Sequence, residues 1–321
     1  MSALPIHAPG RADGRPPPFA SIDAIEADFG AHGYICGPGV ATTVYLAARL
    51  AKPILVEGPP GVGKTELAKV AARHAGLALH RLQCYEGVDE AKALYEWKYG
   101  KQLLYTQMLK EKLSEVLDGA ADLAEGMHRL NGFSDAFFSE AFLEERPLLK
   151  ALRSRDGAVL LVDEIDKADQ EFEALLLEML SDYQVTVPEI GTLSATVKPL
   201  VILTSNSTRT IGEALRRRCL YLHIDFPAPD LERRILHARV PGIDEALAAR
   251  LVTFIDALRT LDLRKGPSVS ELIEWAQALV MMNVATLDED TVRRTLGLVV
   301  KFRQDMAAVE DALPALLSRT P

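Results

Sequence analysis

One stretch, ILVEGPPGVGKTELAKVAARHAG at residues 54–76, constrains the fold of this chain more than any other. Gly58, Gly63, Lys64 and Thr65 fit the spacing G-x-x-x-x-G-K-[ST], after an apolar run typical of a strand and before an amphipathic helical pattern. Glycines let backbone N–H groups approach a phosphate, and the helix N-terminus adds partial positive charge. A glycine-rich turn that matches by chance is the alternative, which the flanking patterns disfavour. The stretch therefore predicts a loop that holds nucleotide phosphates.

A second apolar run, residues 158–162, leads into Asp163 and Glu164. Open α/β sheets bind ligands at the carboxyl ends of their strands, where these acids are expected. We expect Asp163 and Thr65 to hold Mg²⁺, and Glu164 to orient and polarise an attacking water. The alternative is a solvated acidic start of a helix, since acids favour that position. After a phosphate loop, the catalytic interpretation is preferred.

Two further features follow in the same order along the chain. Asn206 ends the apolar run 200–205 and could hold the attacking water near Glu164, although Ser-Asn after a strand is also an ordinary turn. Arg216, Arg217 and Arg218 close a predicted helix, where cations compensate the helix dipole. A guanidinium offered to the γ-phosphate of a neighbouring subunit is the other interpretation, and it would make the site shared between subunits.

The order of apolar and amphipathic segments predicts an α/β fold with a doubly wound parallel sheet, followed by an all-helical C-terminal portion. A length of 321 residues with 48% hydrophobic content allows one large core and a second, smaller one. Ser268 and Glu271 read as a capping box in the helical portion. The expected strands are the apolar runs at 53–57, 77–82, 158–162, 200–205 and 220–226. The expected divisions are a flexible arm at 1–18, the α/β domain at 19–227 and a helical lid domain at 228–321.

Composition narrows the class of protein. A membrane-spanning run and a secretory signal pattern are both absent from the sequence, so we expect a cytoplasmic protein without membrane insertion. Three cysteines, far apart, suggest neither a disulfide framework nor a zinc ribbon. A formal net charge of −9 disfavours a protein that coats nucleic acid.

These elements, in this order, resemble AAA+ ATPases over about residues 35–310. The segments RLQCYEGVDEAKALYEWKYGKQLLY, LLVDEIDKADQEFEALLLEMLSDYQVTVPEIG and KGPSVSELIEWAQAL resemble the MoxR family, in particular its CoxD-like branch associated with carbon monoxide dehydrogenase maturation. The resemblance implies a P-loop AAA+ fold, ATP and Mg²⁺ as ligands, and a homo-oligomer, a hexameric ring. It also implies chaperone-like activation of a client metalloenzyme of the molybdenum hydroxylase type, together with a von Willebrand factor A-domain partner.

The resemblance assigns the motif residues of the family to positions of this sequence one at a time. Lys64 and Thr65 match Walker A, Asp163 and Glu164 match Walker B, and Asn206 matches sensor 1. Arg218 matches the usual arginine-finger position, and Arg217 is the second candidate. The expected nucleotide-binding residues form one continuous segment: Gly58, Pro59, Pro60, Gly61, Val62, Gly63, Lys64, Thr65 and Glu66.

The sequence departs from the family where many members place a sensor 2 arginine. Val269 and Ser270 stand there, and a serine cannot make a bidentate phosphate contact. Arg264 or Lys265 could replace the arginine, or the lid could sense nucleotide less directly.

The resemblance suggests roles for two insertions, of which the first faces a client protein and the second points toward the central pore in related rings. An insert at 86–103 carries Tyr95, Trp97 and Tyr99, for which packing is the favoured interpretation. A hairpin is expected around residues 189–191.

Two other function classes compete with protein remodelling. A P-loop kinase would need an acceptor pocket, and the paired Asp163 and Glu164 favour water as the nucleophile instead. A nucleic-acid-associated or restriction-type AAA+ NTPase is disfavoured by the acidic balance and by the lack of a basic, aromatic-interleaved stripe.

Overall fold

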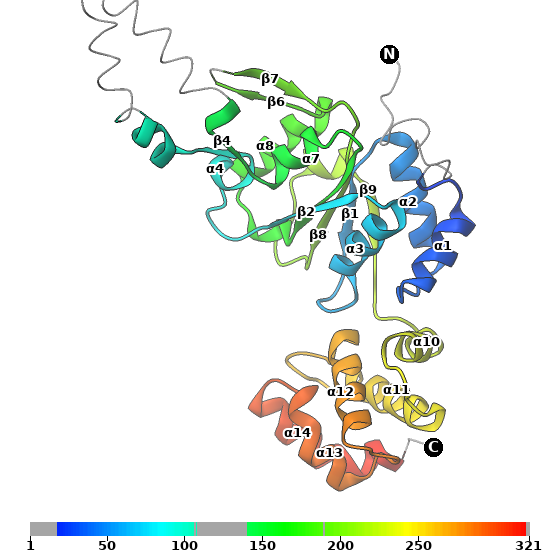
Figure 1. Ribbon diagram of the computed structural model, residues 1–321. Coiled ribbons are helices and arrows are strands. Elements are labelled where there is room, and N and C mark those ends of the chain that lie inside the picture. The colour runs from blue at the N-terminus through cyan, green and yellow to red at the C-terminus, as the bar shows by residue number, and fades with distance from the viewer. Residues whose placement is uncertain (1–17, 106, 108–139, 189, 319–321) are drawn as a thin grey trace, which may run out of the picture.

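The computed structural model describes residues 18–105, 107, 140–188 and 190–318, so nearly all of the expected N-terminal arm lies outside it. Its centre is a five-stranded sheet in the order β2-β5-β8-β1-β9, with every pairing parallel (Figure 1). The strands are β1 (Ile54–Glu57), β2 (Ala78–Gln83), β5 (Ala158–Asp163), β8 (Leu200–Ser205) and β9 (Leu220–His223). Parallel neighbours need crossover connections, which here contain helices. The predicted doubly wound α/β fold is confirmed.

Helices cover both faces of this sheet. In β5, Val159 and Leu161 pack into one hydrophobic cluster, while Leu160 and Val162 pack into another on the opposite face. This two-sided burial explains why the strand reads as a continuous apolar run rather than an alternating one. The first face is covered by α1 (Ile22–Ala31), α2 (Pro38–Leu50) and α3 (Lys64–Ala75). The second is covered by α7 (Pro147–Arg153), α8 (Gln170–Asp182) and α9 (Glu213–Arg218).

The last strand is shorter than the apolar run that predicted it. β9 ends at His223, although the run continues to residue 226. The Ile224 amide still donates to the Glu57 carbonyl at 2.9 Å, but the Phe226 amide donates to the side chain of Asp225 at 2.8 Å. A local side chain thus replaces the neighbouring strand as acceptor, and the ladder stops.

Smaller elements lie beside the main sheet. The predicted hairpin is present as antiparallel β6 (Gln184–Val187) and β7 (Gly191–Ser194), and its residue 189 is outside the described residues. In the insert, Tyr95 and Trp97 stack edge to face at 6.0 Å, whereas Tyr99 is 64% exposed. The remaining short elements are α4 (Glu90–Ala93), β3 (Tyr95–Trp97), η1 (Glu140–Phe142), β4 (Leu143–Glu145) and η2 (Ile165–Lys167).

The C-terminal part is helical and has its own hydrophobic cluster. Trp275 is fully buried there, and its indole N–H donates to the Thr295 hydroxyl at 2.8 Å. Ser268 and Glu271 form the predicted capping box at the start of α12. The elements are α10 (Pro229–Arg239), α11 (Glu245–Arg259), α12 (Val269–Met281), α13 (Glu289–Thr295), η3 (Leu296–Leu298) and α14 (Arg303–Ser318). Within the described ranges, no helix has the length and apolar content to cross a membrane.

Candidate functional site

The glycine-rich loop between β1 and α3 is shaped by close contacts that exclude side chains. Gly58, Gly61 and Gly63 all have positive φ, at 153°, 75° and 99°. A Cβ on Gly58 would lie 1.9 Å from the Ile224 carbonyl oxygen, and a Cβ on Gly61 would lie 2.5 Å from Ser268. Glycine is therefore required where the loop passes close to the segment after β9 and to the residue that caps α12.

Lys64 begins α3 and turns its side chain back along this loop. Its Nζ donates to the carbonyls of Gly58 and Pro59, both at 2.6 Å, and to Asn206 Oδ1 at 2.8 Å. The residue is only 7% exposed. Burial lowers the pKa of Lys64, while the attraction of Asp166 and Asp163 opposes that shift. The ammonium is thus already aimed across the loop toward the ends of the strands.

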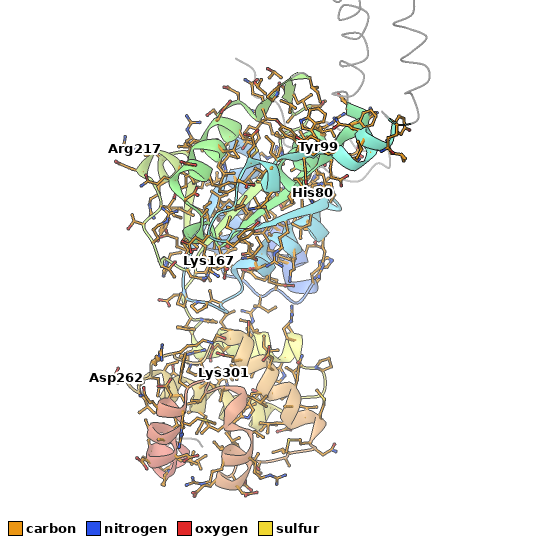
Figure 2. All side chains as sticks on the ribbon, turned by 90° about the vertical axis from the view of Figure 1, so that its left-hand side faces the viewer. His80, Tyr99, Lys167, Arg217, Asp262 and Lys301 are labelled. Carbon is orange, nitrogen blue, oxygen red and sulfur yellow. The ribbon has the colours of Figure 1, made fainter. Side chains whose placement is uncertain are left out.

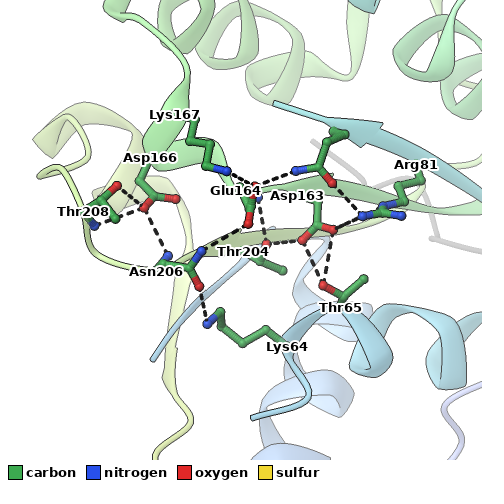
Figure 3. Close-up of polar contacts among 11 residues, drawn as sticks. Lys64, Thr65, Arg81, Asp163, Glu164, Asp166, Lys167, Thr204, Asn206 and Thr208 are labelled. Atoms are coloured by element: carbon green, nitrogen blue, oxygen red, sulfur yellow. Dashed lines mark hydrogen bonds and ion pairs between the residues drawn. The ribbon is translucent and has the colours of Figure 1, made fainter. Parts of the chain in front are cut away.

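Asp163, at the end of β5, accepts five hydrogen bonds from three residues (Figure 3). Its Oδ1 accepts from the hydroxyls of Thr204 at 2.5 Å and Thr65 at 3.0 Å. Arg81 donates to Oδ2 from Nε at 3.2 Å and from Nη2 at 2.7 Å. Arg81 is on β2, where the parallel register pairs Gln83 with Asp163. Sequence reasoning identified Thr65 and Asp163 but missed Arg81 and Thr204.

Glu164 adopts a left-handed backbone conformation, with φ 58° and ψ 49°. For a residue other than glycine this conformation costs about 1–2 kcal/mol, and the Glu164 amide is held in it by the Thr204 hydroxyl at 2.9 Å. The carboxylate accepts from Gln83 at 2.8 Å and from Lys167 at 2.6 Å on Oε2. Its Oε1 accepts from the Asn206 side-chain amide at 3.3 Å. Gln83 is a further residue that sequence reasoning did not identify.

Asn206 joins these groups across the end of the sheet. Its side chain contacts both the Lys64 ammonium and the Glu164 carboxylate. Its backbone amide donates to Asp166 Oδ2 at 3.2 Å. The predicted convergence of Lys64, Asp163, Glu164 and Asn206 at one edge of the sheet is therefore present in the structure.

These side chains surround a polar pocket of about 330 Å³. Of the predicted nucleotide-binding segment, Gly58 and Pro59 supply carbonyls to Lys64, while Val62 lines a neighbouring pocket. The polar pocket is lined by Pro60, Gly61, Gly63, Lys64, Thr65, Glu66, Lys69, Arg81, Gln83, Asp163, Glu164, Thr204, Asn206 and Ser270.

The neighbouring pocket, of about 210 Å³, is more apolar and lies where the α1–α2 connection meets α10 and α12. Tyr34, Ile35 and Cys36 line one side, and Ile235 and Ile273 line another. Burial raises the pKa of the Cys36 thiol to about 11, so it stays protonated at neutral pH. Both pockets share the wall formed by Gly61, Gly63, Glu66 and Ser270. An apolar pocket beside a polar one suits a ligand that carries both an apolar ring and charged groups.

The C-terminal helices touch the glycine-rich loop directly. Both the amide and the hydroxyl of Ser270 donate to the Gly61 carbonyl at 3.2 Å. Arg264 lies over the Phe302 ring at 4.4 Å, and Lys265 pairs with Glu271 at 2.7 Å, so both are engaged outside the two pockets. Arg239, at the end of α10, lines the apolar pocket and approaches Glu66 to 3.6 Å.

The three consecutive arginines of α9 differ in their surroundings. Arg216 pairs with Glu57 at 2.7 Å, and Arg218 donates to the Leu177 carbonyl at 3.0 Å. Arg217 has a 76% exposed side chain beside Glu213. Figure 2 shows Arg217 projecting outward from the α/β part, well away from Lys167. The three arginines therefore lie outside the polar pocket of their own chain.

Comparison with known proteins agrees with this architecture. Residues 54–228 match the family described as ATPase family associated with various cellular activities (AAA). An uncharacterised protein of Staphylococcus haemolyticus is 22% identical over 276 residues, covering 82% of this chain and 90% of its own. An uncharacterised protein of Staphylococcus epidermidis is 24% identical over 275 residues, with 83% and 90% covered.

Among solved structures, the Thermotoga maritima RuvB Holliday junction branch migration motor gives a TM-score of 0.47 at 16% identity. That comparison covers 92% of this chain and 85% of the other. The family match, which spans more than half of the 321 residues, decides the assignment. This chain belongs to the AAA family and is an ATPase.

Proposed function

We propose that the chain binds ATP with its phosphates in the polar pocket and hydrolyses it with a water positioned between Glu164 and Asn206. The observation that carries this proposal is the placement of Asn206, 2.8 Å from the Lys64 ammonium and 3.3 Å from Glu164. A water there can donate to the carboxylate and accept from the amide. Lys64 binds the β- and γ-phosphates, and the loop amides surround the β-phosphate.

Thr65 and Asp163 fit a Mg²⁺ ion. Their side-chain oxygens lie 3.0 Å apart, and hard oxygen donors are the ligands that Mg²⁺ prefers. When bound there, Mg²⁺ would neutralise the charge that develops on the phosphates. Thr204 orients the Asp163 carboxylate for this contact through its 2.5 Å hydrogen bond. Arg81 neutralises part of the same carboxylate in the absence of the metal.

The variant Glu164→Gln tests the assignment of the water-polarising group. Gln keeps the size and one acceptor oxygen but loses the basicity, so kcat should fall by about 10²–10⁴-fold. Binding of a fluorescent ATP analogue should be unchanged, because Glu164 is not among the proposed phosphate or metal ligands. The exposed Glu178, on α8, supplies the matched control Glu178→Gln, which should retain full turnover. Wild-type hydrolysis by Glu164→Gln would refute the assignment.

We further propose that Arg218 or Arg217 completes the site of a neighbouring subunit in a ring, hexameric as in related ATPases. Both lie outside the polar pocket of their own chain, and the Arg217 side chain is 76% exposed. Mixing an Arg217→Ala/Arg218→Ala double variant with Glu164→Gln should restore part of the hydrolysis, since some interfaces then combine an intact acid with an intact arginine. No rescue in rings shown to be mixed would contradict completion in trans.

We assign the chain to the MoxR family and to its CoxD-like branch. In this proposal the helices from residue 228 form a lid, and hydrolysis moves the lid and inserts to remodel a client in the cytoplasm. The client is a molybdenum hydroxylase such as carbon monoxide dehydrogenase, and a von Willebrand factor A-domain protein is the partner. Support comes from the quoted motifs and from exposed Tyr99 and Leu103 on the insert, which offer an apolar contact surface.

Affinity capture tests this assignment. The Glu164→Gln protein, loaded with ATP, should retain a purified von Willebrand factor A-domain protein and the immature hydroxylase. The Lys64→Ala protein serves as the control that cannot load nucleotide. Equal retention by both variants, or by neither, would contradict nucleotide-dependent remodelling of this client.

A further inference from the structure

We propose that Asp166 is a positioning residue that fixes Asn206 relative to Glu164 and Lys64. This inference deepens the proposed function and rests on the roles given there to Asn206 and Glu164. Asp166 lies on η2, two residues after Glu164, and receives three hydrogen bonds on Oδ2 (Figure 3). The donors are the Asn206 amide at 3.2 Å, the Thr208 amide at 3.0 Å and the Thr208 hydroxyl at 2.6 Å.

The loop after β8 needs such an anchor because its backbone is strained. Ser207, between the two amides that Asp166 holds, has φ 59° in the left-handed region that residues other than glycine rarely adopt. Ser205 ends the strand, and its hydroxyl accepts from the Ser207 amide at 2.9 Å. The Asp166 carboxylate thus holds the residues on both sides of Ser207 and fixes the backbone position from which the Asn206 side chain extends.

Burial makes the Asp166 contacts specific. The residue is 4% exposed, and Oδ1 is buried with no hydrogen-bond partner among the described residues. A buried oxygen without a hydrogen-bond partner is unfavourable. The position of Asp166 is therefore not explained by the best possible hydrogen bonding of its own carboxylate. Its hydrogen bonds to other residues of the described ranges all go to the loop that carries Asn206.

The connection is short and runs through one segment of chain. Asp163 and Glu164 lead directly into η2, so the residues proposed for the metal and the water share a backbone with the anchor of the Asn206 loop. A displacement of about 1 Å at a reacting centre can cost about 10²-fold in rate. Loss of the anchor should therefore reduce turnover while nucleotide affinity is retained.

A double-mutant cycle separates positioning from a purely structural role. Asp166→Asn, which lacks the charge and one acceptor oxygen, should lower kcat by about 10–10²-fold and change KM by less than about threefold. In the Asn206→Ala background the same substitution should change kcat by less than about twofold, because no amide remains to be positioned. Equal kcat losses in both backgrounds, or no loss in the wild-type background, would overturn the proposal.

Two further variants distinguish a loss of positioning from general unfolding. Asp169→Asn is the matched control, since Asp169 caps α8 through the Phe172 amide and Asn is an equivalent cap. Thr208→Val removes one bond to Asp166 and should give a smaller, equally non-additive loss of kcat. If Asp166→Asn does not fold, the Thr208→Val cycle decides, and additivity there overturns the proposal.

Amide hydrogen exchange gives a readout that does not depend on turnover. The Asn206 and Thr208 amides should exchange at least about tenfold faster in Asp166→Asn than in the Asp169→Asn control, as expected for loss of a local bond. Unchanged exchange at both amides would overturn the proposal. If Asn206→Ala leaves kcat unaffected, the role proposed for Asn206 in hydrolysis fails, and the exchange rates alone then decide whether Asp166 anchors the loop.

Discussion

The contact between the glycine-rich loop and α12 leads to a prediction that can be worked through from the structure. Gly61 has φ 75°, and a Cβ there would lie 2.5 Å from both Cβ and Oγ of Ser268. Gly87 has a similar φ of 80°, but nothing lies within 4 Å of its Cβ position. Gly61→Ala and Gly87→Ala therefore share the same backbone strain and differ in the clash.

The shared strain is worth about 1–2 kcal/mol in each variant. Gly61→Ala must in addition displace α12, which breaks the two hydrogen bonds from Ser270 to the Gly61 carbonyl. At about 0.5–1.5 kcal/mol for each bond, the extra loss is about 1–3 kcal/mol. For a domain of about 150–250 residues, 1 kcal/mol shifts Tm by about 2–4 °C.

Thermal melting followed by circular dichroism measures this difference. Gly61→Ala should melt at least about 2 °C below Gly87→Ala. Its affinity for a fluorescent ATP analogue should also be about tenfold weaker, which corresponds to about 1.4 kcal/mol, because Gly61 lines both pockets. Equal melting temperatures and equal affinities in the two variants would refute the contact between the glycine-rich loop and α12.

Three other substitutions have defined outcomes. Arg81→Gln leaves the buried Asp163 carboxylate with hydroxyl partners alone, so the free energy of unfolding of the metal-free protein should fall by about 1 kcal/mol. Addition of Mg²⁺ with ADP should then raise the Tm of this variant more than that of the wild type. An equal rise in both proteins would contradict the pairing of Arg81 with Asp163. Hydrogen bonds from Lys265 and Ser268 outweigh burial and hold the pKa of Glu271 below its usual value, so its stabilisation is present above about pH 4 and is lost as pH falls further. The Tm advantage of wild type over Glu271→Gln, measured from pH 7 to 3, should therefore shrink at the acidic end, and a constant difference would contradict this. Trp275→Ala should cost about 3–5 kcal/mol in chemical denaturation, and a loss below about 1 kcal/mol would show that the helical cluster is not packed around it.

Much of the fold could be predicted because the three inner strands of the sheet, β1, β5 and β8, are buried on both faces. The run 158–162 supplies side chains to two clusters and ends in Asp163 and Glu164, so one pattern indicated both a strand and the edge of a site. The same logic placed Asn206 beside them. Parallel strands bring their carboxyl ends to one edge whatever the order of the sheet, and the sequence therefore sufficed.

The residues that were missed depend on register or on packing between distant segments. Arg81 and Gln83 lie at the end of β2, and their signal was available in the same rule, since β2 is a parallel strand that ends at the same edge. The apolar pocket, by contrast, has no comparable signal in the sequence. Tyr34 and Ile273 line it together although they are far apart in the sequence, and no local sequence pattern predicts that they lie near each other.

The account depends centrally on one triphosphate site built by the glycine-rich loop and the ends of β5 and β8. A crystal structure with Mg²⁺ and a non-hydrolysable ATP analogue tests it most directly. We predict the γ-phosphate within hydrogen-bond reach of both Lys64 and Asn206, with the metal on Thr65 and beside Asp163. Phosphates bound elsewhere on the chain, with Lys64 still bonded to the carbonyls of its own loop, would contradict the account.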